Sequence, residues 1–161
     1  MIRAITTVGW IGTIPFAPGT WGSLAGVALT WGLHRLGHAP LVVLATLAVS
    51  ALGIWAIARD PRTANDDPGE IVIDEVAGQM LALWPLSIAL WMQNHPAEVF
   101  PLPGLVGGFL LFRFFDIVKP PPVRWVDRPG AFWIMADDLV AGALAGLVML
   151  IAAGVSHGWF F

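Results

Sequence analysis

Five long runs of apolar residues, separated by short polar segments, dominate this sequence. They cover approximately residues 22–36, 40–58, 71–92, 100–118 and 139–155. A helix needs about 20 apolar residues to cross the hydrocarbon core of a bilayer, and the second and fifth runs approach that length almost without charge. The chain is 57% hydrophobic and 12% charged, which is more apolar than a water-soluble domain usually is. We therefore expect an all-α fold, a polytopic membrane bundle of about five apolar helices, with residues 1–161 forming a single domain.

The charged residues fall on one side of such a bundle. Five crossings place the amino terminus, the loop at 59–70 and the loop at 113–138 on the same side of the membrane. Every Arg and Lys except Arg35 lies on that side or at its membrane edge, as does every Asp and Glu except Glu98. Basic residues in short loops mark the cytoplasmic side. The sequence therefore predicts a multi-pass protein whose polar site faces the cytoplasm.

Two kinds of chemistry are disfavoured by residue type and position. The chain has no cysteine, which excludes thiolate metal sites and a phosphocysteine intermediate. Its histidines all fall on the side opposite the acidic residues, so neither a phosphohistidine mechanism nor a histidine zinc site is indicated. These four are His34, His38, His95 and His157.

Two carboxylates enter the third apolar run. Asp66, Asp67 and Glu70 precede it, and for Asp66 and Glu70 we favour a solvated turn before Pro68. Asp74 and Glu75 stand inside the run, where a charge is costly and generally marks a functional site or an ion pair. We therefore assign them to a site, although a simple preference for a helix amino terminus is the structural alternative.

A basic group closes the fourth run. Arg113 and Asp116 are three residues apart, hence on one face of a helix that Pro120 must end. An internal ion pair with cytoplasmic anchors is the structural interpretation. Lys119, the only lysine of the chain, and Arg124 follow, and such side chains bind phosphate oxygens.

Asp137 and Asp138 open the fifth run, where Asp137 is a candidate amino cap and Asp138 the better inward-facing ligand. Five carboxylates gathered in one place would repel one another unless a hard cation lay between them, and Mg2+ is the first candidate. The predicted metal ligands are Asp74, Glu75, Asp116, Asp137 and Asp138. A carboxylate not needed by the ion is available as a general base.

The segment from Pro15 to Ser23 is rich in small residues and runs into the first apolar helix. Its backbone donors and the hydroxyls of Thr20 and Ser23 are suited to hold an anion at a helix start. Taken alone, the segment is interpreted as a turn and cap.

Together these blocks resemble the phosphatidylglycerophosphatase A family of bacterial membrane phosphatases, over nearly the whole chain. The residues that carry the resemblance are Ala17-Pro18-Gly19-Thr20 with Gly22-Ser23, Asp67-Pro68, Ile73-Asp74-Glu75-Val76 with Gly78, Phe112-Arg113, Phe115-Asp116, Lys119-Pro120, Met135, Asp137-Asp138 and Ala141-Gly142. The resemblance implies a Mg2+-dependent hydrolysis of phosphatidylglycerophosphate to phosphatidylglycerol and phosphate, at the bacterial cytoplasmic (inner) membrane.

On this hypothesis Asp74, Asp116 and Asp138 chiefly hold the ion. Glu75 acts as general base on the attacking water, and Lys119 and Arg113 neutralise the phosphoryl oxygens. The predicted catalytic residues are therefore Asp74, Glu75, Lys119 and Asp138, and the substrate contacts are Thr20, Ser23, Arg113, Lys119 and Arg124. A phosphoaspartyl intermediate is the alternative to direct attack by water.

Three other readings compete with a phosphatase. The first is a small ion-coupled transporter that uses the same carboxylates, the second a lipid phosphotransferase, whose familiar signature is missing, and the third a soluble helical bundle. The expected partners are a membrane phospholipid as substrate and the lipid bilayer, with no nucleic acid.

Overall fold

The computed structural model describes residues 1–64 and 68–156, and the regular secondary structure in these ranges is entirely helical. The all-α prediction is confirmed for this part of the chain. The predicted turn at Asp66 and Asp67 lies outside the described residues, as does His157. The elements are α1 (Ile2–Thr6), η1 (Ile11–Thr13), α2 (Pro18–Ile57), η2 (Pro61–Ala64), α3 (Ile73–Ala82), α4 (Trp84–Met92), α5 (Leu102–Val118), α6 (Val123–Val126) and α7 (Ala131–Ser156).

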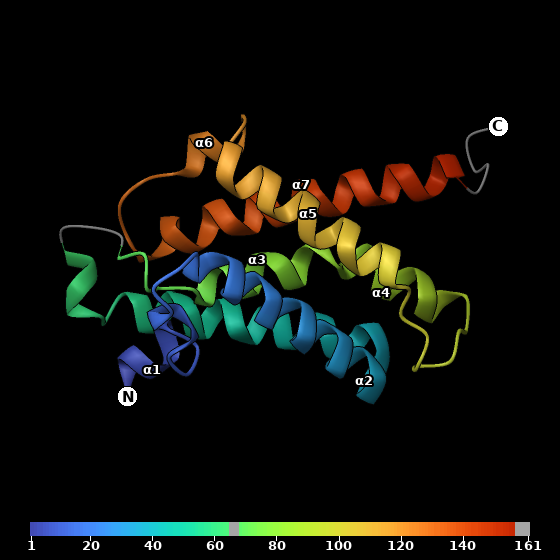
Figure 1. Ribbon diagram of the computed structural model, residues 1–161, viewed down its shortest axis with the longest axis horizontal. Helices are drawn as coiled ribbons and strands as arrows, with labels where there is room; N and C mark the ends of the chain where they lie inside the picture. Colours follow the sequence, from blue (N-terminus) through green and yellow to red (C-terminus); the bar gives the residue numbers. More distant parts are fainter. Residues whose placement is uncertain (65–67, 157–161) are drawn as a thin grey trace.

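Helix α2 consists of two arms that lie side by side. Its backbone leaves helical angles at Gly37 and His38, and the φ of His38 is +54°. The first arm (residues 18–36) runs away from the amino-terminal end of the bundle, and the second arm (residues 39–57) returns (Figure 1). The two arms correspond to the first two predicted apolar runs.

Both arms pack against the beginning of α3. A Cβ added to Gly22 of the first arm would lie 2.8 Å from the Cβ of Val72. One added to Gly53 of the second arm would lie 3.5 Å from Cγ1 of Ile73. Such contacts require the chain to reverse within α2, because a straight helix of 40 residues would be about 60 Å long.

The third and fourth apolar runs form helices as expected, with one division. The third run is split at Leu83, where α3 ends and α4 begins with Pro85 in its first turn. Proline has no N–H to continue the hydrogen bonding, so the predicted kink falls there. Helix α5 ends at Val118, and Lys119 follows with a left-handed φ of 45° before Pro120.

Helix α7 begins at Ala131, eight residues before the predicted run, and this boundary prediction was wrong. Asp137 and Asp138 therefore lie in the second turn, and Asp137 is not an amino cap. Residues Ile134 and Met135 explain the earlier start, because they are buried in a core cluster with Ile57 of α2. Asp137 and Asp138 thus mark the start of the apolar run but not the start of the helix.

The alternating helix directions bring the polar segments to one end of the bundle, the site end (Figure 1). The starts of α2, α3 and α7 lie there together with the end of α5 and helix α6. The opposite end contains His34, whose Nδ1 lies 2.8 Å from Ser87 Oγ and whose ring centroid lies 4.8 Å from that of Phe100.

Two helices of the described part are long and apolar enough to cross a membrane. They are α2, counted as one element although its two arms run in opposite directions, and α7, with mean hydropathies of 2.2 and 2.3 in their most apolar segments. Helices α3, α4 and α5 are shorter, at 10, 9 and 17 residues. The structure thus has two candidate spanning helices where the sequence predicted about five.

Candidate active site

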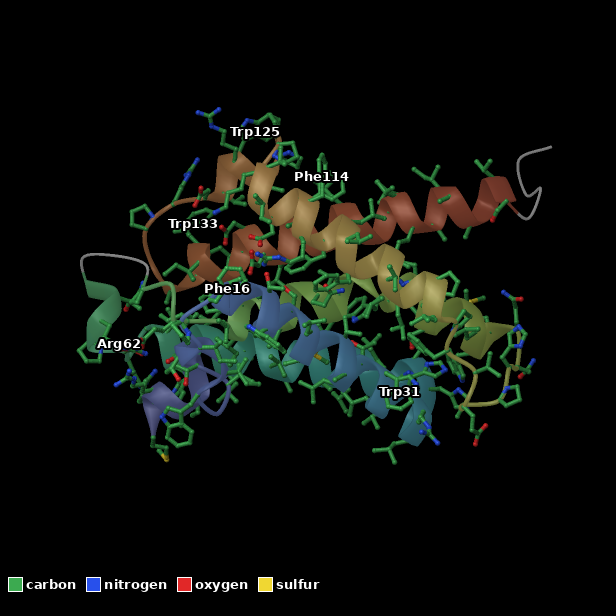
Figure 2. The ribbon with its side chains drawn as sticks, viewed as in Figure 1. Phe16, Trp31, Arg62, Phe114, Trp125 and Trp133 are labelled. Atoms are coloured by element: carbon green, nitrogen blue, oxygen red, sulfur yellow. The ribbon has the colours of Figure 1, made fainter. Side chains whose placement is uncertain are left out.

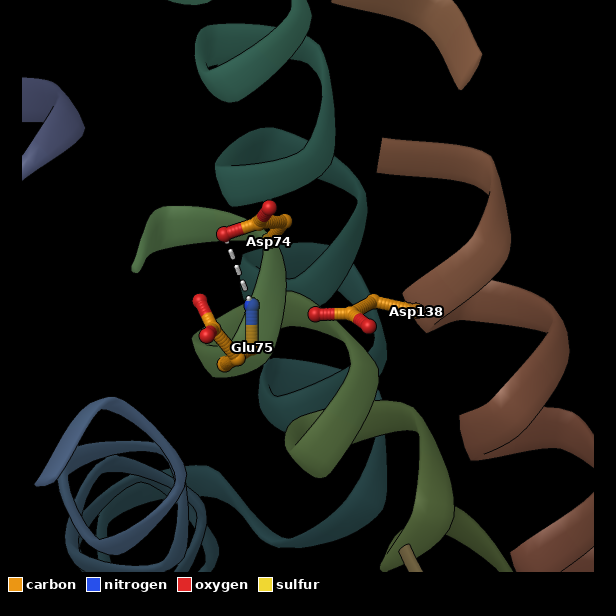
Figure 3. Close-up of side chains that lie close together, drawn as sticks. All are labelled: Asp74, Glu75 and Asp138. Atoms are coloured by element: carbon orange, nitrogen blue, oxygen red, sulfur yellow. Dashed lines mark hydrogen bonds between the residues drawn. The ribbon is translucent and has the colours of Figure 1, made fainter. Parts of the chain in front are cut away.

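Three carboxylates from two helices converge at the site end. Asp74 and Glu75 lie in the first turn of α3, and Asp138 reaches toward them from α7 (Figure 3). One carboxylate oxygen from each lies within 4.8 Å of the others. Asp74 and Asp138 are 6% and 4% exposed. Oε2 of Glu75 is enclosed and has no hydrogen-bond partner among the described residues.

The local backbone explains why α3 and α7 bring these side chains together. A Cβ added to Gly78 would lie 2.6 Å from Cε2 of Phe112 and would also meet the carbonyl of Asp138. Gly142, one turn further along α7, lies directly against the backbone of Gly78. Close approach of two helices requires such small residues. Asp74 is oriented by a hydrogen bond of 3.1 Å, which its Oδ1 accepts from the backbone N–H of Glu75.

Arg113 brings a positive charge to the cluster from α5. Its Nη1 donates to Asp116 at 2.6 Å and to the Oγ of Ser23 at 3.4 Å, on the first turns of α2. A Cβ on Gly19 would touch Glu75 and would lie 3.2 Å from Arg113, so both side chains reach the start of α2. Ser23 and Arg113, which were each predicted to contact the substrate, therefore lie beside the carboxylates.

Asp116 has two electrostatic roles here. It is ion-paired with Arg113, as the structural interpretation of the sequence expected. Its charge also repels those of Glu75 and Asp138. It is not one of the three acids whose oxygens all lie close enough to share an ion.

Lys119 is bound by two carboxylates at the edge of the site. Its Nζ lies 2.7 Å from Oδ2 of Asp137 and 3.1 Å from Oδ1 of Asp127. Burial opposes the ammonium charge, but the hydrogen bonds and the attraction of Asp137 and Asp127 outweigh burial and raise the pKa of Lys119. Lys119 is therefore a permanent cation at neutral pH.

The remaining predicted contacts are placed less centrally. Thr20 is half-buried in the first turn of α2, and Arg124 is exposed on α6. Asp137 faces Lys119, while its Oδ1 accepts the backbone N–H of Asp138 at 3.1 Å. The predicted ligand set thus divides into three acids that converge and two, Asp116 and Asp137, that are paired with cations.

The three converging acids fit a hard divalent cation. Carboxylate oxygens are the ligands that Mg2+ and Ca2+ prefer. Three such groups, largely removed from water, repel one another strongly unless a cation or protons neutralise them. The unpaired Oε2 of Glu75 shows that the described residues do not complete this set of interactions.

Sequence reasoning did not find Asp127 as a partner of Lys119. The residue stands in the loop after α6, and its proximity to Lys119 depends on how residues 120–126 turn. A carboxylate eight positions after a lysine in a proline-rich loop carries no periodic signal, so nothing in the sequence pointed to this contact.

Comparison with known proteins places the chain in a family. A model of the family described as Phosphatidylglycerophosphatase A matches residues 4–153. A phosphatidylglycerophosphatase A of Escherichia coli is 32% identical over 92% of this chain and 79% of its own length. The protein of the same name from Haemophilus influenzae is 34% identical over 86% of this chain and 80% of its own length.

A third relative carries a different name. A putative phosphatidylinositol-3-phosphatase of Bacteroides thetaiotaomicron is 33% identical over 89% of this chain and 88% of its own length. No solved structure matches the chain. The family match covers almost all of α1 to α7, including each residue of the converging acids. The chain therefore belongs to the phosphatidylglycerophosphatase A family of phosphoric monoester hydrolases.

Proposed function

We propose that this chain hydrolyses the terminal phosphomonoester of phosphatidylglycerophosphate, giving phosphatidylglycerol and phosphate. The observation that carries the proposal is the convergence of Asp74, Glu75 and Asp138 beside Arg113. The names of the relatives from E. coli and H. influenzae supply the substrate. The three relatives are all named as phosphatases, so an ion-coupled transporter has no support from them.

The site is proposed to lie at the cytoplasmic surface of a bacterial inner membrane, in a multi-pass protein. Leucines exposed along the bundle support contact with lipid, among them Leu44 on α2 and Leu150 on α7. Large aromatic side chains are exposed at the site end, including Phe16 and Trp125 (Figure 2). Aromatic residues favour the headgroup level of a bilayer, where the substrate's phosphate is found.

Asp74 and Asp138 would hold a divalent cation, for which Mg2+ is the first candidate, with Asp116 nearby. When bound, this cation would neutralise charge on the phosphoryl oxygens. Arg113 donates to the same oxygens as a two-pronged cation, and Lys119 does so as a point charge. Thr20 and Arg124 are the proposed contacts of the headgroup, while Ser23 is fully buried and accepts a hydrogen bond from Arg113.

Glu75 is the proposed general base. Its Oε2 is enclosed and has no hydrogen-bond partner among the described residues, while its Oε1 lies beside Gly19 at the start of α2. Oε2 is therefore free to accept a proton from an attacking water. The water's oxygen forms the new bond to phosphorus, the phosphorus–oxygen bond to the glyceryl group breaks, and the departing oxygen gains a proton. Direct attack by water is proposed in preference to a phosphoaspartyl intermediate.

The decisive experiment measures phosphate release by detergent-purified protein. The substrates are phosphatidylglycerophosphate, phosphatidic acid, phosphatidylinositol 3-phosphate and a soluble phosphomonoester, each with Mg2+ or with a chelator. Release from the first alone, and only with Mg2+, is expected. Phosphate release chiefly from phosphatidylinositol 3-phosphate would refute the proposed substrate and favour the one in the name of the B. thetaiotaomicron relative. Full activity in the presence of chelator would refute the proposed requirement for a divalent cation.

A further inference from the structure

The ammonium group of Lys119 has one N–H donor left. An ammonium carries three donors. One is directed to Oδ2 of Asp137 at 2.7 Å and one to Oδ1 of Asp127 at 3.1 Å. Among the described residues these two carboxylates are its ion-pair partners, so the third donor remains for a ligand.

Lys119, Asp127 and Asp137 form a clamp that joins three segments at the edge of the site. Lys119 directly follows α5, Asp127 follows α6, and Asp137 belongs to α7. The side chain of Asp137 is 10% exposed, and its other oxygen accepts a hydrogen bond from the N–H of Asp138. Asp137 therefore contacts Lys119 from the interior of the protein. The side chain of Asp127 is 49% exposed and contacts Lys119 from the solvent side. The clamp is thus one residue from the converging acids.

We propose that Asp127 is a positioning residue for substrate binding, which acts by directing the remaining N–H donor of Lys119 toward a phosphoryl oxygen. This inference rests on the proposed function. A lysine has a flexible four-carbon stem, and with Asp137 alone its ammonium would turn about a single contact. A second acceptor removes that freedom before the substrate arrives, which lowers the entropy cost of binding.

The proposal predicts a separation of KM from kcat. Asp127→Ala removes the outer acceptor, and we expect KM for phosphatidylglycerophosphate to rise about tenfold, because hydrogen bonds to charged groups have this order of effect. The value of kcat should stay within about twofold, since Asp127 touches no reacting atom. Asp127→Asn keeps an oxygen acceptor in place and should restore KM to within about threefold of the wild-type value.

Glu70→Ala is the matched control. Glu70 is similarly exposed, at 42%, and likewise contacts two cations, Arg3 and Arg62, but it lies outside the site. Its removal should leave KM unchanged. An equal rise in KM for Glu70→Ala would show that loss of any loop ion pair has this effect, and would overturn the proposal.

A double-mutant cycle tests whether Asp127 acts through Lys119. In a Lys119→Met background, neither Asp127→Ala nor Asp127→Asn should raise KM further. An undiminished effect in that background overturns the proposal, as does an unchanged KM for Asp127→Ala. If the alanine variant fails to fold, the smaller effect of Asp127→Asn decides, since it too must vanish with Lys119→Met. A wild-type protein without phosphatase activity would instead overturn the proposed function.

Discussion

A Cβ added to Gly78 would lie 2.5 Å from the carbonyl oxygen of Asp138. Real side chains do not approach a backbone oxygen so closely, so α3 and α7 reach their observed separation only because residue 78 has no side chain. The same contact sets the carboxylate of Asp138 against those of Asp74 and Glu75. The site therefore depends on a residue that carries no chemistry of its own.

Gly78→Ala should separate α3 from α7 and lower phosphatase activity by at least tenfold. Overpacking of this kind costs about 1–3 kcal/mol, so the unfolding temperature in detergent should also fall. Gly107→Ala is the control, because a Cβ at Gly107 would meet nothing within 4 Å and alanine favours a helix. Comparable losses of activity in both variants would show that the close approach of α3 and α7 at Gly78 is not required for activity.

Asp74→Asn and Asp138→Asn should each reduce phosphate release by more than about 100-fold, because each removes one of the charges proposed to hold a cation. Both proteins should still insert in the membrane and unfold at a temperature close to wild type, since relief of carboxylate repulsion offsets the lost contact. Glu98→Gln, at an exposed position remote from the converging acids, is the control. Wild-type turnover by Asp74→Asn would refute its assignment to the site.

Much of this site could be predicted from the sequence because the cost of burying charge is a strong constraint. Asp74, Glu75 and Asp138 stand in apolar stretches of the sequence, where a carboxylate without a function or an ion-pair partner is rare. Their convergence follows from helices that alternate in direction. The partners of Arg113 and Lys119 depend on side-chain reach across three helices, and only the i, i+3 pair with Asp116 has a sequence signature.

The boundaries were less predictable, for a physical reason. Hydropathy marks where a chain becomes apolar, whereas a helix begins where its backbone can be capped and packed. Residues 131–138 join α7 because Ile134 and Met135 fill the core cluster, although Asp137 and Asp138 interrupt the apolar pattern. In α2 the hydropathy pattern was the better guide. The backbone break at Gly37 and His38 divides this element into two arms, which match the first two predicted apolar runs.

Stability should depend on pH through Asp60 and Arg62, outside the site. Oδ2 of Asp60 accepts hydrogen bonds from Arg62 at 2.5 Å and from Thr6 at 3.0 Å. The hydrogen bond from Arg62, which outweighs the opposing effect of burial, lowers the pKa of Asp60 to about 2. A lowered folded-state pKa stabilises the fold above the unfolded pKa of about 4, by roughly 2 kcal/mol, and this contribution is lost as the pH falls toward 2.

The measurement compares wild type with Asp60→Asn in thermal unfolding between pH 7 and pH 3. The wild type should be the more stable protein at pH 7, and the difference should shrink steadily below pH 4. A difference that stays constant over this range would mean that the charge of Asp60 contributes nothing and that only its shape matters.

Gln79 offers a test of an unpaired polar group in the bundle. Its side chain is fully buried on α3, and neither amide atom has a hydrogen-bond partner among the described residues. An unsatisfied buried group costs about 1–3 kcal/mol, whereas an apolar side chain of the same shape does not bear this cost. Methionine is unbranched and close to glutamine in length, so Gln79→Met should raise the free energy of unfolding by about 1 kcal/mol or more.

Thermal unfolding in detergent would measure this change, with Gln93→Met as the control because Gln93 is exposed at the end of α4. The control should leave the unfolding temperature unchanged within a degree or so, as surface substitutions usually do. A clear fall in stability for Gln79→Met would contradict the prediction, because it would require that the amide has a partner, such as an ordered water held between α2 and α3. The comparison thus shows whether the buried amide of Gln79 destabilises the fold or stabilises the packing of α3 against its neighbours.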